Sequence, residues 1–458
     1  MATHSPPLVS KALPLLGHAL EFSRNPERLM RRGKQMHGDM FTIQLLNKHA
    51  VVVNGSELNK FFYLQTDKKL NINDAYGMLE AAFGQVLFIA SNEDYENQRP
   101  LLNYVFSREK MSGYVKSMQY EVQRWLDTLG DSGEMDLTAE MQKLTQFVAG
   151  NSFLGADFQD ELGPDFWDAY ALIGKSLDPV LPSHWPLPKF RRRDSAKLHI
   201  RQTFYPMLAK RRQNPDEYDD LISQLLKTNQ KDGTILDDET IISLFMGLIF
   251  AGHETTAGQV AWLVYEIVKN DHFYSRLKAE VDENVPVGTQ IDGRVLRSMQ
   301  QTYWAIDETT RLHPSAPLQI RTVKEDIELN GYKIPAGWLM MVNYANGHFD
   351  PEVWSDPERF DPDRWSPERK EGKNAFDIIG FGGGRHKCTG MNFAKNEMAV
   401  IAGLLFQQYE LEVLSDEVHS VLNIGAARPS EILVRYQKKS SKTELENLEA
   451  TSAFVNLV

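Results

Sequence analysis

The sequence predicts a mainly α-helical fold with a small β subdomain, arranged around one long central helix. The segment from Asp237 to Asn270 is apolar on nearly all sides in its first half, which is typical of a helix buried at the centre of a domain. Short β-branched runs fall in two stretches, about 35–60 and 320–345, and helical spacing dominates elsewhere. No repeat or low-complexity linker divides residues 1–458, so we expect a single domain that ends in a charged, frayed tail over 437–458.

The β subdomain is expected from two local signals. Residues 41–45 and 50–53 are rich in β-branched side chains and are followed by an Asn54-Gly55 turn signal. Residues 327–334 alternate around Asn330-Gly331, a pair that favours the two-residue turn of a β-hairpin.

The helices are expected from apolar spacing and from charges at their starts. Helical spacing covers about 93–130, and a basic stretch at 190–194 opens a helix that runs to about residue 212. The long central helix begins with acidic residues at 237–239, which suit the positive end of a helix dipole. Another helix is predicted directly after Gly390.

The composition excludes several classes of protein. Lys and Arg number 50 against 62 Asp and Glu, a net charge of −12, which argues against nucleic-acid binding. A single cysteine excludes disulfides and cysteine-rich metal sites. No stretch approaches the ~20 apolar residues of a transmembrane helix, and the N-terminus lacks a signal peptide. We therefore expect a soluble, cytoplasmic, bacterial-type protein without a transmembrane anchor. Peripheral binding to a membrane surface is the alternative.

The one cysteine, Cys388, lies in a glycine-rich loop that runs from Phe381 to Gly390. Three successive glycines allow a close approach to a flat ligand. Basic neighbours and the following helix N-terminus favour the thiolate form of Cys388. A buried structural cysteine is the alternative at this point; a phosphate-binding loop is disfavoured, because its G-x-x-x-x-G-K-[ST] pattern is absent.

This loop resembles the F-x-x-G-x-x-x-C-x-G haem signature of the cytochrome P450 superfamily. Three further motifs resemble those of the family, in the family's order. They are Ala251-Gly-His-Glu254-Thr255-Thr256 for the oxygen-activation segment, Glu308-Thr-Thr-Arg311 for E-x-x-R, and Pro357-Glu-Arg359-Phe360 for P-E-R-F. The resemblance implies the cytochrome P450 fold and a bound haem b (iron protoporphyrin IX), with Cys388 as the iron ligand.

The resemblance also implies roles for the remaining motif residues. Glu254 and Thr255 would deliver protons to bound O2, and Glu308, Arg311 and Arg359 would form a structural trio that supports the cysteine loop. Tyr95 and Arg99 match a W-x-x-x-R element, with Tyr replacing Trp. The expected haem-contacting residues are Tyr76, Tyr95, Arg99, Arg321, Phe381, His386, Cys388 and Gly390.

Within this superfamily, the chain most resembles the sterol 14α-demethylase branch. The similarity lies in the first residues of the chain and in Tyr76 and Phe83-Gly84. That branch carries a His-Thr-Ser run where this chain has the monooxygenase pair Glu254-Thr255. The resemblance thus implies a monooxygenase of a small lipophilic substrate (sterol, terpenoid or fatty acid). Electrons would come from NAD(P)H through a ferredoxin or an NADPH reductase. Sterol 14α-demethylation itself, and a reductase-independent peroxygenase or isomerase, are the alternatives, with a non-catalytic haem module ranked last. The candidate pocket walls are Tyr76, Phe83, Phe88, Phe250, Ala251, Leu318 and Ile424.

Overall fold

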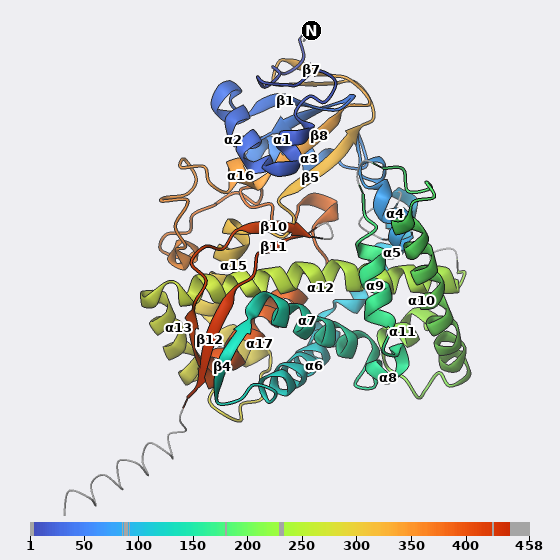
Figure 1. The fold of residues 1–458 in the computed structure, drawn as a ribbon, viewed down its shortest axis with the longest axis vertical. Helices are drawn as coiled ribbons and strands as arrows, with labels where there is room; N and C mark the ends of the chain where they lie inside the picture. The colour runs from blue at the N-terminus through green and yellow to red at the C-terminus, as the bar shows by residue number, and fades with distance from the viewer. Residues whose placement is uncertain are drawn as a thin grey trace, which may run out of the picture.

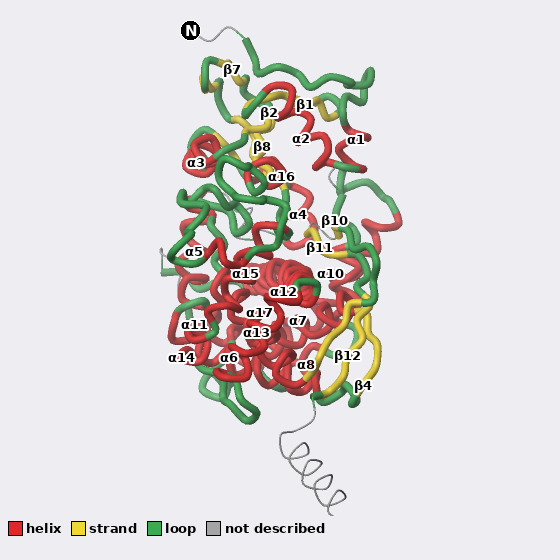
Figure 2. The backbone as a smooth tube through the Cα atoms, turned by 90° about the vertical axis from the view of Figure 1, so that its left-hand side faces the viewer, coloured by secondary structure: helices red, strands yellow, loops and turns green. Residues whose placement is uncertain are grey.

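The computed structural model describes residues 4–84, 86, 90, 92–178, 181–228, 233–423 and 426–439. A β-rich lobe lies beside the N-terminus, and a helical body lies below it, crossed by the long helix α12, Asp238–Val268 (Figure 1). Viewed along its axis, α12 is surrounded by helices, with the larger sheet above (Figure 2). The expected mainly α fold with a small β part is confirmed.

A five-stranded sheet forms the core of the β-rich lobe, in the order β1-β2-β8-β5-β3. Its neighbouring strands β2 and β8 are parallel, with Val51 opposite Met340, and the other pairs are antiparallel. Side chains alternate along β2: Val51 and Val53 are buried on one face, and Ala50 and Val52 are buried on the other. The strands are β1 Met40–Leu45, β2 Lys48–Val53, β3 Leu70–Asn71, β5 Leu318–Val323 and β8 Leu339–Asn343.

The hairpin of β6 (Ile327–Leu329) and β7 (Tyr332–Ile334) turns at Asn330-Gly331. Both turn residues have positive φ, 50° and 81°, as a type I′ turn requires. Helices pack on this lobe or join it to the body: α1 Ala19–Arg24, α2 Pro26–His37, α3 Ser56–Gln65, η1 Asn73–Ala75, α4 Gly77–Phe83 and α16 Tyr344–Gly347.

The central helix starts where its acidic segment predicts. The side chain of Asp237 accepts a hydrogen bond from the Thr240 N–H at 2.8 Å and so caps the helix. The helix packs against α7 (Leu137–Leu154), α15 (Gln300–Leu312) and α17 (Met391–Gln408). Among the described residues it is the one helix long and apolar enough to cross a membrane. However, 72% of its apolar window is buried within the protein, so it serves as the core helix.

The helical stretch expected over 93–130 is divided in two. Helix α5 covers Asn92–Val105 and α6 covers Arg108–Leu126, with Ser107 capping the second. The other body helices are α8 Phe158–Leu162, α9 Phe166–Gly174, α10 Pro188–Gln213, α11 Leu221–Lys227, α13 Asp271–Asn284, α14 Gly293–Ser298, η3 Pro362–Trp365 and η4 Gly384–His386.

Two further small sheets were not predicted. One has the order β4-β12-β9 and the other pairs β10 with β11. Their strands are β4 Ser132–Asp136, β9 Tyr409–Val413, β10 Ser420–Asn423, β11 Ala426–Pro429 and β12 Leu433–Lys438. Gln437 and Lys438, expected in the frayed tail, belong to β12, and residues 440–458 lie outside the described part of the chain.

Candidate functional site

A cavity of about 380 Å³ lies between α12, the cysteine loop and the edge of the β-rich lobe. It brings together residues that are far apart in the sequence, including Thr255 of α12 and Cys388 before α17. Most of its wall is apolar, with contributions from Leu102, Phe106, Phe153, Leu244, Leu248 and Phe393. This cavity is therefore the candidate site.

The loop before α17 needs its glycines because it packs tightly under α3. Gly382 and Gly384 have φ of 67° and 61°, which other residues rarely adopt. A Cβ on Gly384 would lie 2.9 Å from the main-chain oxygen of Tyr63. The Cys388 N–H donates to the Phe381 carbonyl at 2.9 Å and closes the loop. The loop conformation thus fixes the position of the Cys388 sulfur.

The thiol of Cys388 is open to the cavity, which itself lies inside the protein. Burial raises its pKa above the ordinary value. Hydrogen bonds from the Gly390 and Met391 N–H groups, and the charges of Arg99 and Lys387, act in the opposite direction without outweighing burial. The expectation that the loop alone favours the thiolate is therefore wrong, because it neglected desolvation. Metal coordination would deprotonate this sulfur outright.

Basic side chains line the cavity from three separate elements: Arg99 of α5, Arg321 of β5, and His386 and Lys387 of the cysteine loop. Arg321 is only 3% exposed and donates to two uncharged acceptors, the Ile320 carbonyl at 2.8 Å and the Thr66 hydroxyl at 3.3 Å. The charge of the Asp67 carboxylate acts on Arg321, but that carboxylate bonds His386 instead. Burying a guanidinium without a directly bonded anion is costly, so this site favours a negatively charged ligand group.

His386 adds a second sign of an anionic ligand. Its Nε2 lies 2.7 Å from an Asp67 carboxylate oxygen, while its Nδ1 is buried without a hydrogen-bond partner among the described residues. Buried polar atoms in native proteins nearly always have a partner. Together with Arg321, this orphaned nitrogen fits the carboxylates of a haem.

Tyr76 and Tyr95 also line the cavity. The Tyr95 hydroxyl donates to the Arg385 carbonyl and accepts from Arg99 at 3.0 Å, and Arg99 also donates to the Lys387 carbonyl at 3.2 Å. Tyr76 accepts from the Ile320 N–H at 3.1 Å. Phe381 and Gly390 complete the set, so every expected haem-contacting residue lies on this one cavity.

The central helix presents its small and hydroxyl-bearing residues to the cavity. Ala251, Gly252 and Thr255 line it, and the Thr255 hydroxyl donates to the Ala251 carbonyl at 2.5 Å. Leu248 and Leu244 stand about one and two turns before Ala251 on the same face. These two leucines were not predicted, although their i, i+4, i+7 spacing to Ala251 could have identified them.

Glu254, the expected partner of Thr255 in proton delivery, is not among the residues that line the cavity. Its carboxylate is buried against α7, where it accepts from the Gln142 side chain at 3.3 Å and lies 3.8 Å from His253 Nδ1. Adjacent residues on a helix point about 100° apart. A neighbouring acid and alcohol therefore need not face the same ligand.

The predicted pocket walls are only partly correct. Tyr76, Phe250 and Ala251 line the cavity. Phe83 does not: it is buried behind Phe250, with ring centroids 4.4 Å apart. Leu318 packs instead against the apolar cluster on one face of the larger sheet. Phe88 and Ile424 lie outside the described residues.

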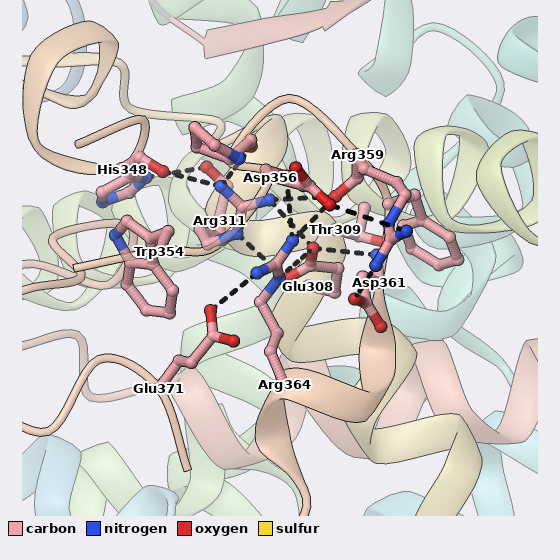
Figure 3. Close-up of polar contacts among 12 residues, drawn as sticks. Glu308, Thr309, Arg311, His348, Trp354, Asp356, Arg359, Asp361, Arg364 and Glu371 are labelled. Carbon is pink, nitrogen blue, oxygen red and sulfur yellow. Dashed lines mark hydrogen bonds and ion pairs between the residues drawn. The ribbon is translucent and has the colours of Figure 1, made fainter. Parts of the chain in front are cut away.

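A buried ionic network lies beside the cysteine loop, centred on Glu308 of α15 (Figure 3). Glu308 accepts from Arg311 Nε at 3.0 Å and Nη2 at 2.8 Å, and from Arg364 Nε at 2.9 Å. All three side chains are 0% exposed. The Asp361 N–H and the Trp365 indole also donate to this carboxylate, so the buried anion is fully satisfied.

The second arginine of this network is Arg364 and not the predicted Arg359. The Arg359 side chain is 61% exposed and pairs with Asp361, while only its main-chain carbonyl accepts from Arg311 and Arg364 (Figure 3). Both arginines belong to the same short segment, and the turn from Asp356 to Trp365 points Arg364 inward.

His348 connects the network to the cysteine loop. Its Nδ1 bonds the Arg311 carbonyl at 2.8 Å, and its Nε2 accepts from the Ile379 N–H at 2.9 Å. Because one nitrogen must donate and the other accept, the ring is neutral here; burial lowers its pKa to about 3. The Ile379 carbonyl then accepts from Gly382, within the loop.

We expect Arg364→Lys to lower the free energy of unfolding by about 3 kcal/mol, because a lysine cannot meet Glu308, Glu371 and the nearby carbonyls at once. Arg359→Lys is the matched control and should change it by less than about 0.5 kcal/mol. Urea unfolding followed by circular dichroism measures both. Equal losses would contradict the assignment of Arg364.

A family model described as cytochrome P450 matches residues 6–432. The sterol 14alpha-demethylase of Mycolicibacterium vanbaalenii is 30% identical over 436 residues, covering 92% of this chain and 96% of the relative. The sterol 14-demethylase of Arabidopsis thaliana is 27% identical over 448 residues, covering 95% and 91%.

Solved structures have the same fold. A cyanobacterial cytochrome P450 with bound retinoic acid superposes with a TM-score of 0.86 at 23% identity, covering 96% of this chain and all of the other. A mutant cytochrome P450 heme domain gives 0.83 at 21% identity, covering 96% and 98%. With a family model that spans nearly its whole length and a cavity built around one loop cysteine, the chain belongs to the cytochrome P450 family of haem-dependent monooxygenases.

Proposed function

We propose that this chain inserts one oxygen atom from O2 into a lipophilic substrate at a haem b held by Cys388. The observation that carries the proposal is that Cys388, the Thr255 hydroxyl and the basic side chains of Arg99, Arg321 and His386 all line one largely apolar cavity. Each of these residues alone could serve many other roles. Because they converge on one cavity from α5, α12, β5 and the cysteine loop, they favour one flat, anionic cofactor.

Different residues of the chain would hold different parts of the haem. Cys388 would supply the iron ligand, and Arg99, Arg321 and His386 would hold the propionates. No group of three His, Cys, Asp or Glu among the described residues could hold a bare metal ion, which is consistent with a macrocycle supplying the other iron ligands. When bound, a thiolate-ligated haem supplies the O2-activating chemistry.

Thr255 is the residue we assign to proton handling on the substrate side. Its hydroxyl faces the cavity and is held by the Ala251 carbonyl, so it can accept a hydrogen bond from a bound ligand or turn to donate one. Glu254 lies behind it against α7, so a proton from this carboxyl would have to travel by water or by a turn of the side chain.

The substrate class follows from the walls and from the relatives. Leu244, Leu248 and Phe250 make the α12 wall apolar, which suits a sterol, a terpenoid or a fatty acid. Sterol 14α-demethylation is the second candidate, supported by relatives that are 30% identical. The sterol 14α-demethylase branch carries a His-Thr-Ser run where this chain has the monooxygenase-type Glu254-Thr255-Thr256. This difference favours the broader assignment, a monooxygenase of a lipophilic substrate.

Electrons would come from NAD(P)H through a ferredoxin or an NADPH reductase in the cytoplasm. The docking surface we propose is the outer side of the cysteine loop. Its basic residues are partly paired: Arg385 contacts Glu96 and Asp67, and Lys395 contacts Asp307. Lys387 is exposed, so its charge is the one to reverse in a test of this docking surface.

Thr255→Ala should yield at least about tenfold less product per NAD(P)H oxidised and release peroxide instead, since a positioned proton donor contributes about 10²–10⁴ in rate. Thr255→Ser should recover coupling. Thr309→Ala is the control, because Thr309 makes the same bond to the carbonyl four residues before it but does not line the cavity. Product and peroxide are measured together, and full coupling in Thr255→Ala would refute the assigned role.

Optical titration of the haem-loaded protein with sterols, terpenoids and fatty acids tests the substrate class. A substrate that displaces the water ligand of the iron shifts the Soret band, and we expect saturable shifts with at least one of the three. Tight binding and turnover of 14α-methyl sterols alone would favour the second candidate. Turnover that proceeds with peroxide and gains nothing from a reductase would contradict the redox-partner assignment.

Lys387→Glu should slow reduction of the haem by a ferredoxin or reductase at low ionic strength, and the difference should fade as salt screens the charge. Lys333→Glu makes the same charge change on β7, remote from the cysteine loop, and should leave the rate unchanged. Stopped-flow reduction under carbon monoxide measures both. An effect of equal size in the two variants would remove the proposed docking surface.

A further inference from the structure

A short loop between α15 and β5 contacts α12 at Thr255, the residue to which we assign proton handling. The loop covers residues 313–317. Its Ser315 is 8% exposed and lines the cavity, and the Ser315 hydroxyl donates to the Thr255 main-chain carbonyl at 2.9 Å. The loop is therefore bonded to the main chain of the residue whose side chain faces the cavity.

The 313–317 loop is fixed to α12 by three further contacts. The His313 ring stacks on Trp262 with ring centroids 3.8 Å apart, and its Nε2 lies 2.6 Å from a Glu266 carboxylate oxygen. The Gln259 side chain donates to the His313 carbonyl. Together with Thr255, these α12 residues are spaced i, i+4, i+7, i+11 and so lie on one face of the helix. The loop thus binds α12 along about three turns, of which the first holds Thr255.

Other contacts hold the loop from its remaining sides. The Ala427 N–H of β11 donates to the Ser315 carbonyl at 2.8 Å, and β11 itself packs against α12. Helix α15 ends at Leu312, and Pro314, which has no N–H for a helical bond, keeps the loop from continuing it. The Ser315 hydroxyl is therefore a fixed donor that is aimed at one carbonyl.

Two hydrogen bonds at Thr255 lie outside the regular pattern of an α-helix. Its hydroxyl donates back to the Ala251 carbonyl at 2.5 Å, and its own carbonyl accepts from Ser315. Back-bonding hydroxyls, and side chains that bond helix carbonyls from outside, both bend helices. The main chain of Thr255 therefore depends on the donor at Ser315. A shift of about 1 Å in a reacting group can cost about a hundredfold in rate, so this dependence matters for the reaction.

We propose that Ser315 is a positioning residue: its hydroxyl fixes the Thr255 main chain and so aims the Thr255 hydroxyl into the cavity. The inference deepens the proposed function and rests on it for its catalytic consequence. A serine that merely satisfies its own buried hydroxyl would stabilise the fold without directing Thr255, and the experiment separates the two roles.

Ser315→Val and Ser315→Thr test the proposal, because the two new side chains have nearly the same size and only threonine keeps a hydroxyl. In crystal structures of the haem-loaded protein, the Thr255 hydroxyl should be displaced from its bond to the Ala251 carbonyl in Ser315→Val and unmoved in Ser315→Thr. Product formed per NAD(P)H oxidised should fall several-fold in Ser315→Val and stay near the wild-type level in Ser315→Thr.

Thr138→Val is the matched control. Thr138 is also buried, and its hydroxyl donates to a carbonyl that is remote in sequence, that of Ser430, at 2.9 Å and away from the cavity lining. This variant should lower the melting temperature about as much as Ser315→Val does and leave coupling intact.

Ser315→Val should add nothing to the uncoupling of Thr255→Ala, because a residue that acts through the Thr255 hydroxyl has no effect once that hydroxyl is removed. An unmoved Thr255 hydroxyl in Ser315→Val, full coupling in that variant, equal uncoupling in the Val and Thr variants, or additive losses in the double variant would each overturn the proposal. Ser315→Ala serves for the same measurements if Ser315→Val fails to fold. Failure of the proposed function itself would instead appear as a wild type without product or without the thiolate carbon monoxide band.

Discussion

The buried carboxylate of Glu308, shared by two guanidinium groups, is the constraint on which the site depends. Taking one anion and two cations out of water costs several kcal/mol for each ion. Only complete pairing of the three charges offsets this desolvation cost. The structure meets that condition with donors from Arg311, Arg364, Trp365 and the Asp361 main chain. Because these partners come from both α15 and the segment before the cysteine loop, the network can be satisfied only when that segment is folded against the helix.

The network reaches the cysteine through main-chain hydrogen bonds and one neutral ring. His348 stands between the Arg311 carbonyl and the Ile379 N–H, and Ile379 in turn receives the Gly382 N–H. A protonated imidazole could not accept from Ile379, so the low pKa of this histidine, about 3, keeps the connection intact at any ordinary pH. The Glu308 network is thus joined to the loop that places Cys388 through main-chain hydrogen bonds and one neutral ring.

The sequence predicted which segments meet better than which side chain performs each contact. The cysteine loop, the central helix and the Glu308–Arg311 pair follow from motif and periodicity, and each lies where expected. Arg364 could not be chosen over Arg359, because the choice depends on the turn between them. That Glu254 faces α7 and not the cavity could not be predicted, because a helix that is apolar all round gives no sign of which face meets the ligand. The thiol pKa depends on desolvation, which no local charge pattern reports.

The fold also separates the two kinds of polar group that the cavity contains. Cations enter from α5, β5 and the cysteine loop, whereas the uncharged Thr255, Gln259 and Thr310 come from α12 and α15. A flat ligand with carboxylates along one edge can bury that edge only against the cations, so the division orients it. On the α12 and α15 side, the described lining residues are all uncharged. Protons can there be passed by hydroxyl groups and water without a buried ion pair competing for them.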